Sequence, residues 1–195
     1  MAASNPQKIT GNWRSGYALD LHTTGSTYLG VDEYGHNKFD NSYTELGGLL
    51  NRLKYKNDQS AAREIIATAA DFLRPERAKF DLIVPVPAST YRSVQPVLLL
   101  ANGLGAAIGL PVVRCVTTTR PTTQLKAIED FAEREKALLG LHAVDAMHTT
   151  EKNVLLFDDL FRSGATLNAI TNVLLEHGGA KNVYAFTVTR TRSNR

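Results

Sequence analysis

The chain has 195 residues, of which 43% are hydrophobic, and this is enough apolar material for one domain with a buried core. Its 22 lysines and arginines are interspersed with 19 aspartates and glutamates, so the net charge of +3 does not indicate nucleic acid as a direct ligand. No apolar run approaches the roughly 18 residues that span a bilayer, and the first ten residues do not resemble a secretory signal, which predicts a cytoplasmic protein without a membrane partner.

The first 42 residues are expected to be rich in β-structure. Apolar and polar residues alternate over 17–22 and again over 27–31, on either side of Thr23-Thr24-Gly25-Ser26, which predicts a hairpin with a longer loop. We expect residues 1–42 to form an N-terminal hood or accessory segment and residues 43–195 to form the main domain.

The main domain is predicted to begin with two helices. Leu46, Leu49, Leu50 and Leu53 follow helical spacing, and a second helix is predicted over 59–73, ended by Pro75. Strands and helices then alternate, with strands over 81–86, 112–117, 153–157 and 183–189 and helices within 94–109 and 165–177. This order predicts an α/β fold with a doubly wound, mostly parallel sheet.

Cys115 lies within an apolar run, where a buried structural thiol is the expected role. Neither this one cysteine nor the five histidines follow the spacing of metal ligands. The sequence therefore predicts no structural zinc.

The most informative segment is 154–166. Four apolar residues, Val154 to Phe157, indicate a strand buried on both faces, and Asp158 and Asp159 are expected at its carboxyl end. Small residues follow where the next helix opens, and there backbone N–H groups and the helix dipole favour a phosphate. The pattern predicts a ribose-phosphate site, and the alternative is a polar loop at the end of a core strand.

This succession resembles the phosphoribosyl-pyrophosphate (PRPP) signature of type I phosphoribosyltransferases. The resemblance implies that fold, and it implies that Asp158 and Asp159 bind the ribose 2′ and 3′ hydroxyls as the catalytic pair. It assigns the 5′-phosphate to the segment that follows, which comprises Arg162, Ser163, Gly164, Ala165 and Thr166.

Residues 81–87, Asp-Leu-Ile-Val-Pro-Val-Pro, are similar to a run in ComF-type members of that family. The resemblance implies pyrophosphate binding by Pro87, Ala88 and Ser89, against the alternative of a Pro-bounded strand end. Arg120, in an Arg-x-x-Thr-Gln element, resembles the clamp of the mobile hood, against the alternative of a solvated loop. Leu53-Lys54-Tyr55 also resembles a ComF element, although a lysine on a helix edge is normally solvated, and no role is assigned to Lys54.

The resemblance covers roughly residues 43–195, with departures that concern the acceptor. The four-cysteine zinc ribbon common in ComF proteins is missing. The family's Arg-Gly-Phe-Asn-Gln is replaced by Arg92-Ser93-Val94-Gln95-Pro96, and an expected Asn is Ala137. The N-terminal hairpin would take the place of the variable hood that selects the base in type I enzymes.

The resemblance implies a phosphoribosyltransferase that transfers the phosphoribosyl group of PRPP to an unidentified nitrogenous base or amine and releases pyrophosphate. Mg²⁺ is expected as cofactor, carried by PRPP near Asp158 and Asp159 without direct protein ligation, and a homodimer is expected by analogy. One alternative is a non-catalytic PRPP- or nucleotide-binding module serving regulation or DNA uptake. Another is a nucleic-acid-binding protein with a degenerate site.

Overall fold

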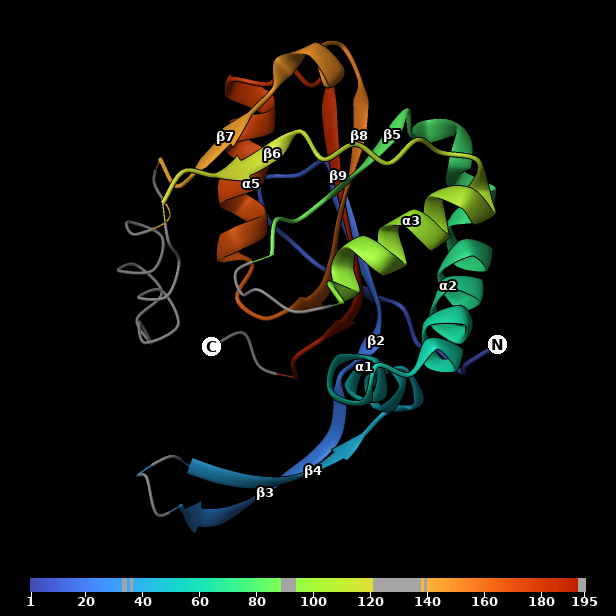
Figure 1. The fold of residues 1–195 in the computed structure, drawn as a ribbon, viewed down its shortest axis with the longest axis vertical. Helices are drawn as coiled ribbons and strands as arrows, with labels where there is room; N and C mark the ends of the chain where they lie inside the picture. Colours follow the sequence, from blue (N-terminus) through green and yellow to red (C-terminus); the bar gives the residue numbers. More distant parts are fainter. Residues whose placement is uncertain (33–34, 36, 89–93, 121–137, 139, 193–195) are drawn as a thin grey trace.

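The computed structural model describes residues 1–32, 35, 37–88, 94–120, 138 and 140–192. A five-stranded central sheet has the strand order β1-β2-β9-β8-β5 (Figure 1). Strands β2, β9, β8 and β5 run parallel, and β1 pairs antiparallel with β2 at one edge. The strands of this sheet are β1 (Gln7–Lys8), β2 (Ser15–Leu21), β5 (Leu82–Pro85), β8 (Asn153–Phe161) and β9 (Asn182–Arg190).

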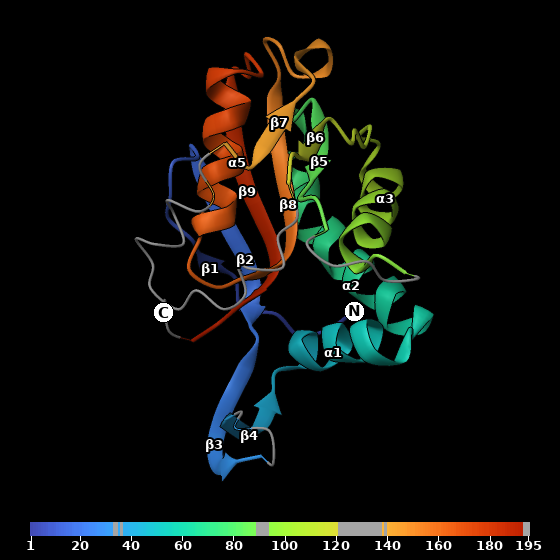
Figure 2. The same cartoon turned by 60° about the vertical axis from the view of Figure 1, so that its left-hand side comes forward.

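Helices cover both faces of this sheet (Figure 2). On one face lie α1 (Glu45–Lys56), α2 (Gln59–Leu73) and α3 (Pro96–Ile108), and on the other lies α5 (Ala165–Glu176). Short 3₁₀ helices η1 (Arg74–Lys79) and η3 (Ala146–His148) complete the helical structure of the described residues. The predicted α/β class and mostly parallel, doubly wound sheet are confirmed.

Strand β8 explains why the run from Val154 to Phe157 is apolar without alternation. Leu155 and Phe157 pack into the cluster formed with α1, α2 and α3, whereas Val154 and Leu156 pack into the cluster formed with α5. Because successive side chains of a strand point to opposite faces, a strand covered on both sides requires an apolar residue at every position.

The predicted hairpin between 17–22 and 27–31 is wrong. Strand β2 instead joins the central sheet beside β9, where Ala18 and Leu19 are fully buried on its two faces. The observed hairpin is formed by β3 (Thr23–Val31) and β4 (Asn37–Tyr43), and it extends away from the body of the molecule (Figure 1). The first 21 residues therefore share a sheet with the α/β core, and a hood role for the N-terminal segment stays a prediction.

The strand predicted over 112–117 is also corrected. Val112 makes a single parallel bridge to Ile83 of β5, after which the chain leaves the central sheet. It forms β6 (Val116–Thr118), which pairs antiparallel with β7 (His142–Val144) in a separate two-stranded sheet. Cys115 is buried as expected, and burial raises the pKa of its thiol.

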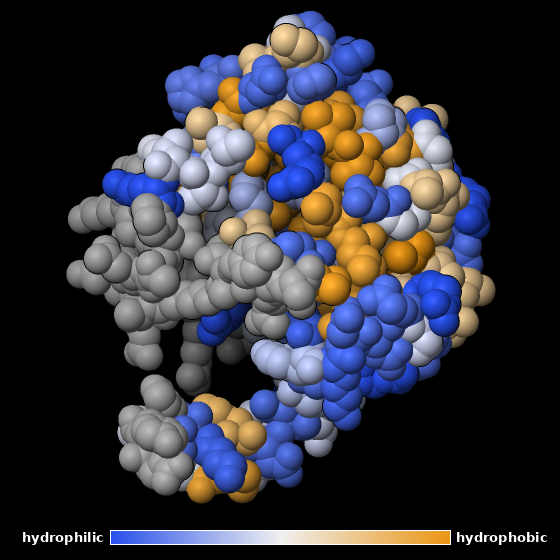
Figure 3. All heavy atoms as spheres, viewed as in Figure 1, coloured by the Kyte–Doolittle hydropathy of each residue, from blue (hydrophilic) through white to orange (hydrophobic). Residues whose placement is uncertain are grey.

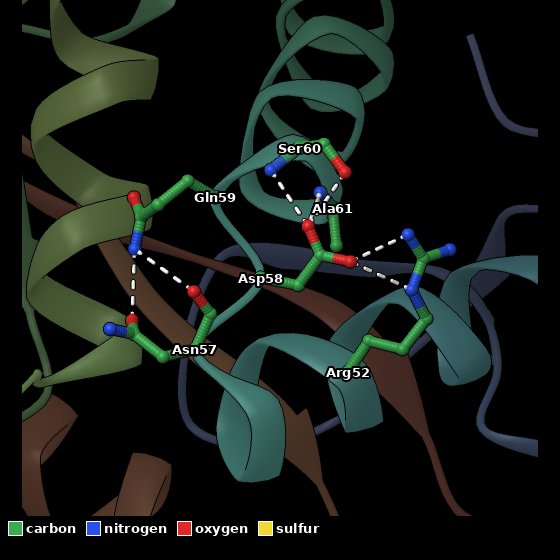
Figure 4. Close-up of polar contacts among 6 residues, drawn as sticks. All are labelled: Arg52, Asn57, Asp58, Gln59, Ser60 and Ala61. Atoms are coloured by element: carbon green, nitrogen blue, oxygen red, sulfur yellow. Dashed lines mark hydrogen bonds and ion pairs between the residues drawn. The ribbon is translucent and has the colours of Figure 1, made fainter.

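The junction between α1 and α2 is fixed by Asp58, which begins the second helix (Figure 4). Its Oδ1 accepts hydrogen bonds from the backbone N–H groups of Ser60 and Ala61, at 2.9 and 3.2 Å. Its Oδ2 accepts from Arg52 at 2.9 Å from Nε and 2.6 Å from Nη2. The Ser60 hydroxyl and the Arg52 guanidinium hold the pKa of Asp58 well below its ordinary value.

We expect Asp58→Ala to lower the melting temperature by about 2–4 °C, because the variant loses both the helix cap and the Arg52 contact. Asp58→Asn keeps a capping oxygen and is expected to lie between the wild type and the alanine variant. Since a carboxylate with a lowered pKa stabilises the folded state only while ionised, the differences should shrink as the pH falls through the range where this carboxylate takes up its proton. Circular dichroism melts at pH 7 and pH 3 check this, and an unchanged ranking and spacing at pH 3 would contradict it.

Candidate functional site

The candidate site lies where β8 continues beyond the end of its neighbour β5. The last residue of β8 that pairs with β5 is Phe157, whereas β8 continues beside β9 as far as Phe161. Asp158 and Asp159 therefore lie inside the strand, with Asp158 in register with Thr187, and not at its carboxyl end as predicted. The strand continues past the apolar run because β9 still provides backbone partners on one side.

The two carboxylates point to opposite faces of the sheet. Asp158 continues the row of Val154 and Leu156 on the α5 face, whereas Asp159 continues the row of Leu155 and Phe157 on the face of α1. Asp158 also accepts a hydrogen bond from the backbone N–H of Asp159 at 2.8 Å. The adjacent acids thus present their charges to different surroundings.

A cavity of about 150 Å³ lies at the start of α5. It is lined by Asp158 and by residues 160–167, which include all five predicted phosphate-binding residues. The loop from Arg162 to Gly164 enters the helix at Ala165, so the cavity opens onto the first backbone N–H groups of α5. The structure brings the predicted phosphate segment and one of the predicted acids to one concave site.

Gly164 shapes this entry into the helix. Its φ of +82° is in the left-handed region that favours glycine, and a Cβ there would lie 3.1 Å from the Phe161 ring. Side-chain oxygens of Thr44 and Asp58 cap α1 and α2, whereas Gly164 provides no side-chain acceptor to α5. The N–H of Ala165 donates to the Ser163 hydroxyl at 3.4 Å, so the next N–H groups of the first turn are left to an external acceptor or to water.

The Trp13 ring supports the loop from below. It meets the Phe161 ring edge-on with 6.2 Å between centroids, and its Nε1 donates to the Ile9 carbonyl at 3.1 Å. Both rings are buried, so the far N-terminal segment and the end of β8 form one packed floor under residues 162–164. The sequence did not indicate this support.

Asp159 forms an ion pair with Lys54 of α1, with 2.8 Å between Oδ2 and Nζ. Their side chains are only 13% and 19% exposed, so the pair is partly shielded from water. Lys54 was given no role from the sequence. The signal that could have found it is position, because Lys54 follows Leu50 by four residues and so lies on the apolar face of the helix.

His22 lies beside this pair, between β2 and β3. Its Nδ1 lies 3.0 Å from the Thr189 hydroxyl, and its ring meets the Tyr43 ring edge-on at 5.4 Å. Burial and the Lys54 charge lower the pKa of His22, while Asp159 opposes them, so the imidazole is neutral at pH 7. His22 is a second residue of this region that sequence analysis missed.

Helix α1 is held against His22 by a close backbone contact. A Cβ on Gly47 would lie 1.9 Å from the His22 carbonyl oxygen, so only glycine fits there without movement. The Thr44 hydroxyl donates to the Leu21 carbonyl at 2.6 Å and accepts from the Gly47 N–H at 3.0 Å. These contacts set the position of α1 and, through it, the position of Lys54.

Among the predicted pyrophosphate residues, the described ones, Pro87, Ala88 and Arg120, do not line the cavity. Pro87 and Ala88 follow β5, where the Val86 N–H donates to the Phe157 carbonyl at 2.9 Å, and Ser89 lies outside the described residues. Arg120 is exposed just beyond β6.

The described residues contain no group of three or more histidine, cysteine, aspartate or glutamate side chains that could hold a metal ion. Mg²⁺ is commonly bound through one or two carboxylates together with substrate phosphates, and Asp158 in the cavity fits that mode. Within the same residues, no helix has the length and apolar content needed to cross a membrane.

Neither a protein-family model nor a curated protein matches the chain. Solved structures with a similar fold include orotate phosphoribosyltransferase from Aeropyrum pernix, at 15% identity and a TM-score of 0.48, covering 88% of this chain and 77% of that one. Adenine phosphoribosyltransferase from Saccharomyces cerevisiae is similar at 16% identity and a TM-score of 0.46, covering 82% and 80%.

Glutamine PRPP amidotransferase from B. subtilis is similar at 23% identity and a TM-score of 0.45, over 65% of this chain. The chain spans about a quarter of that protein's length, and the same holds for a second enzyme of purine biosynthesis.

The pKa of Asp158 predicts how stability depends on pH. Burial and the neighbouring Asp159 carboxylate raise this pKa to about 7, so the folded protein keeps a proton that the unfolded chain releases near pH 4. The contribution of Asp158 is therefore present at pH 4 and is lost as the pH rises to about 7.

Asp158→Asn removes this titration, and we expect the variant to gain in melting temperature relative to the wild type as the pH rises from 4 to 8. Calorimetric melts of both proteins at four pH values check this. Parallel curves for the two proteins would contradict the raised pKa.

Proposed function

We propose that the chain is a phosphoribosyltransferase that binds PRPP with Mg²⁺ and transfers its phosphoribosyl group to a nitrogenous acceptor, releasing pyrophosphate. The observation that carries this proposal is the cavity in which Asp158 faces the first turn of α5, whose N-cap residue Gly164 has no side-chain acceptor. A carboxyl group and a phosphate-binding turn at one cavity suit a ligand that has hydroxyls at one end and a phosphate at the other.

The phosphate end is assigned to Arg162, Ser163, Gly164, Ala165 and Thr166. Backbone N–H groups at a helix start donate to phosphate oxygens, and the helix dipole favours the negative charge. The Ser163 and Thr166 hydroxyls can donate as well. Glycine suits the entry to the helix because its φ of +82° would strain any other residue and because a Cβ there would crowd the Phe161 ring.

The ribose end is assigned to Asp158 and Asp159. Asp158 lines the cavity and has a raised pKa, so near pH 7 it can donate a hydrogen bond to a ribose hydroxyl as well as accept one. Asp159 is paired with Lys54. A carboxylate beside C1 would stabilise the positive charge that develops there as pyrophosphate leaves, and Asp159 is our candidate for that role.

In the proposed reaction a nitrogen of the acceptor forms a bond to C1 of the ribose while the bond from C1 to the pyrophosphate oxygen breaks. Pro87, Ala88, Ser89 and Arg120 are proposed to bind the leaving pyrophosphate. Bound Mg²⁺ would supply neutralisation of pyrophosphate charge. The chain itself needs to hold the reactants in line and exclude water, and this is positioning rather than covalent chemistry. A cytoplasmic location and a homodimer belong to the same proposal.

The proposal is tested by measuring pyrophosphate release from PRPP and Mg²⁺ with a panel of purines, pyrimidines and small amines, beside calorimetric titration with PRPP alone. Release with at least one acceptor class is expected. Binding of PRPP without release for any acceptor would favour the non-catalytic PRPP-binding module, and the absence of both would refute the site.

Asp159→Asn should lower pyrophosphate release by about 10²-fold or more, because the variant loses a charge next to the reacting carbon. It also removes the carboxylate that forms the ion pair with Lys54, and we expect a loss of stability on the order of 1–3 kcal/mol. Lys54→Met in the same background removes the lysine charge as well and should restore melting temperature without restoring turnover. Asp145→Asn, a carboxylate that caps η3, is the matched control. Wild-type turnover in Asp159→Asn would exclude the assigned role.

A further inference from the structure

The β3–β4 hairpin contains five of the ten exposed large apolar side chains among the described residues. Tyr28, Leu29, Val31 and Phe39 are each about half exposed, and every residue of β4 is exposed. Figure 3 shows hydrophobic residues on the surface of the hairpin, which projects at the lower end of the molecule. A two-stranded ribbon is marginally stable in water by itself, so this hairpin is expected to gain a further partner.

The two outer edges of the hairpin differ in their ability to pair. Register shifts between Thr23 and Gly25 and between Tyr28 and Gly30 place two bulges on β3, and Gly30 has a φ of +102°. Bulges twist a strand and interrupt its backbone ladder. Strand β4 has an unbroken register over seven residues, so β4 offers the regular edge.

The sequence of β4 is complementary to itself. It contains Asn37-Lys38-Phe39-Asp40-Asn41. When two such strands run antiparallel about a two-fold axis at Phe39, Lys38 lies opposite Asp40 of the partner strand on both sides of the axis. Asn37 then lies opposite the other Asn41, and the two Phe39 rings meet. Opposite charges, amide pairs and aromatic pairs directly across a sheet all stabilise pairing.

We propose that the β4 edge binds a second copy of this chain, forming an antiparallel four-stranded sheet centred on Phe39. Such an interface is isologous, because the same strand contributes both halves. Phe39 already packs against Tyr28 of its own hairpin, with 5.4 Å between ring centroids and the ring planes tilted by 58°. The pairing would therefore gather the Phe39 and Tyr28 rings of both copies on one face of the sheet.

The bulges of β3 give this assembly an end. After two β4 strands have paired, both outer edges of the new sheet are β3 strands, whose irregular ladders disfavour further addition. The pairing thus predicts a closed dimer. It does not predict an assembly in which many hairpins add one after another. This interface depends on the hairpin alone and on no step of the proposed reaction.

The test is a charge exchange on the full chain, with the dimer dissociation constant measured by analytical ultracentrifugation. Lys38→Asp places two acids opposite each other, and Asp40→Lys places two lysines opposite each other. Each should raise the dissociation constant about tenfold or more. The double variant Lys38→Asp/Asp40→Lys restores opposite charges in the two-fold register and should restore the dimer. Lys181→Asp, an exposed site at the start of β9, is the control of equal charge change.

Mixing the two single variants provides a second readout, because a Lys38→Asp chain and an Asp40→Lys chain are complementary. We expect them to form a heterodimer although each alone is largely monomeric. A wild type that stays monomeric at its highest soluble concentration would overturn the proposal. So would a wild-type dimer whose dissociation constant is the same in both single variants, since its interface must then lie elsewhere. Unchanged circular dichroism melts of the variants would verify that the hairpin remains folded.

Discussion

The organisation of the molecule depends on one constraint, which is that β8 is sandwiched between layers over its first half and loses one neighbouring strand in its second half. As far as Phe157 the strand has β5 on one side, β9 on the other and helices above and below, so only apolar residues fit. Beyond Phe157 the partner β5 is gone while β9 continues. Carboxylates become acceptable there because one edge is open, yet the surviving ladder still fixes where Asp158 and Asp159 point. The position at which the hydrophobic core gives way to polar residues is thus set by the difference in length between β5 and β8.

The second organising feature is the meeting of three segments that are distant in sequence. His22 ends the sheet part of the N-terminal segment, Lys54 belongs to α1 and Asp159 belongs to β8. The contact of Gly47 with the His22 carbonyl brings the first two together, and the ion pair joins the third. The N-terminal segment is therefore not merely attached to the α/β core. It positions the cation that balances the charge of one site acid, while the other acid is left to the cavity near α5.

Much of this architecture could be predicted from local patterns, because those patterns have one interpretation. The leucines of α1, the apolar face of α2 and the run Val154–Phe157 each fit only one buried environment, and small residues at 163–166 pointed to the cavity at α5. The partner of β2 could not be predicted in the same way. Alternation over 17–22 is satisfied equally by a hairpin or by a place beside β9, and Thr23–Ser26 resembled a turn although the strand passes through it. Lys54 was missed because its place on the apolar face of α1 indicates burial but does not identify Asp159, which is distant in sequence, as its partner.

The packing of Trp13 beneath residues 162–164 has a practical consequence. The chain contains one tryptophan, and its ring lies edge-on to Phe161 and 3.7 Å from the position a Cβ would take at Gly164. The ultraviolet emission of the whole protein therefore originates almost entirely from an indole that contacts the floor of the cavity. An anion that binds at the start of α5 and shifts these rings therefore changes the fluorescence of Trp13. The molecule carries its own optical reporter, and ligand occupancy can be followed in solution without attaching a dye.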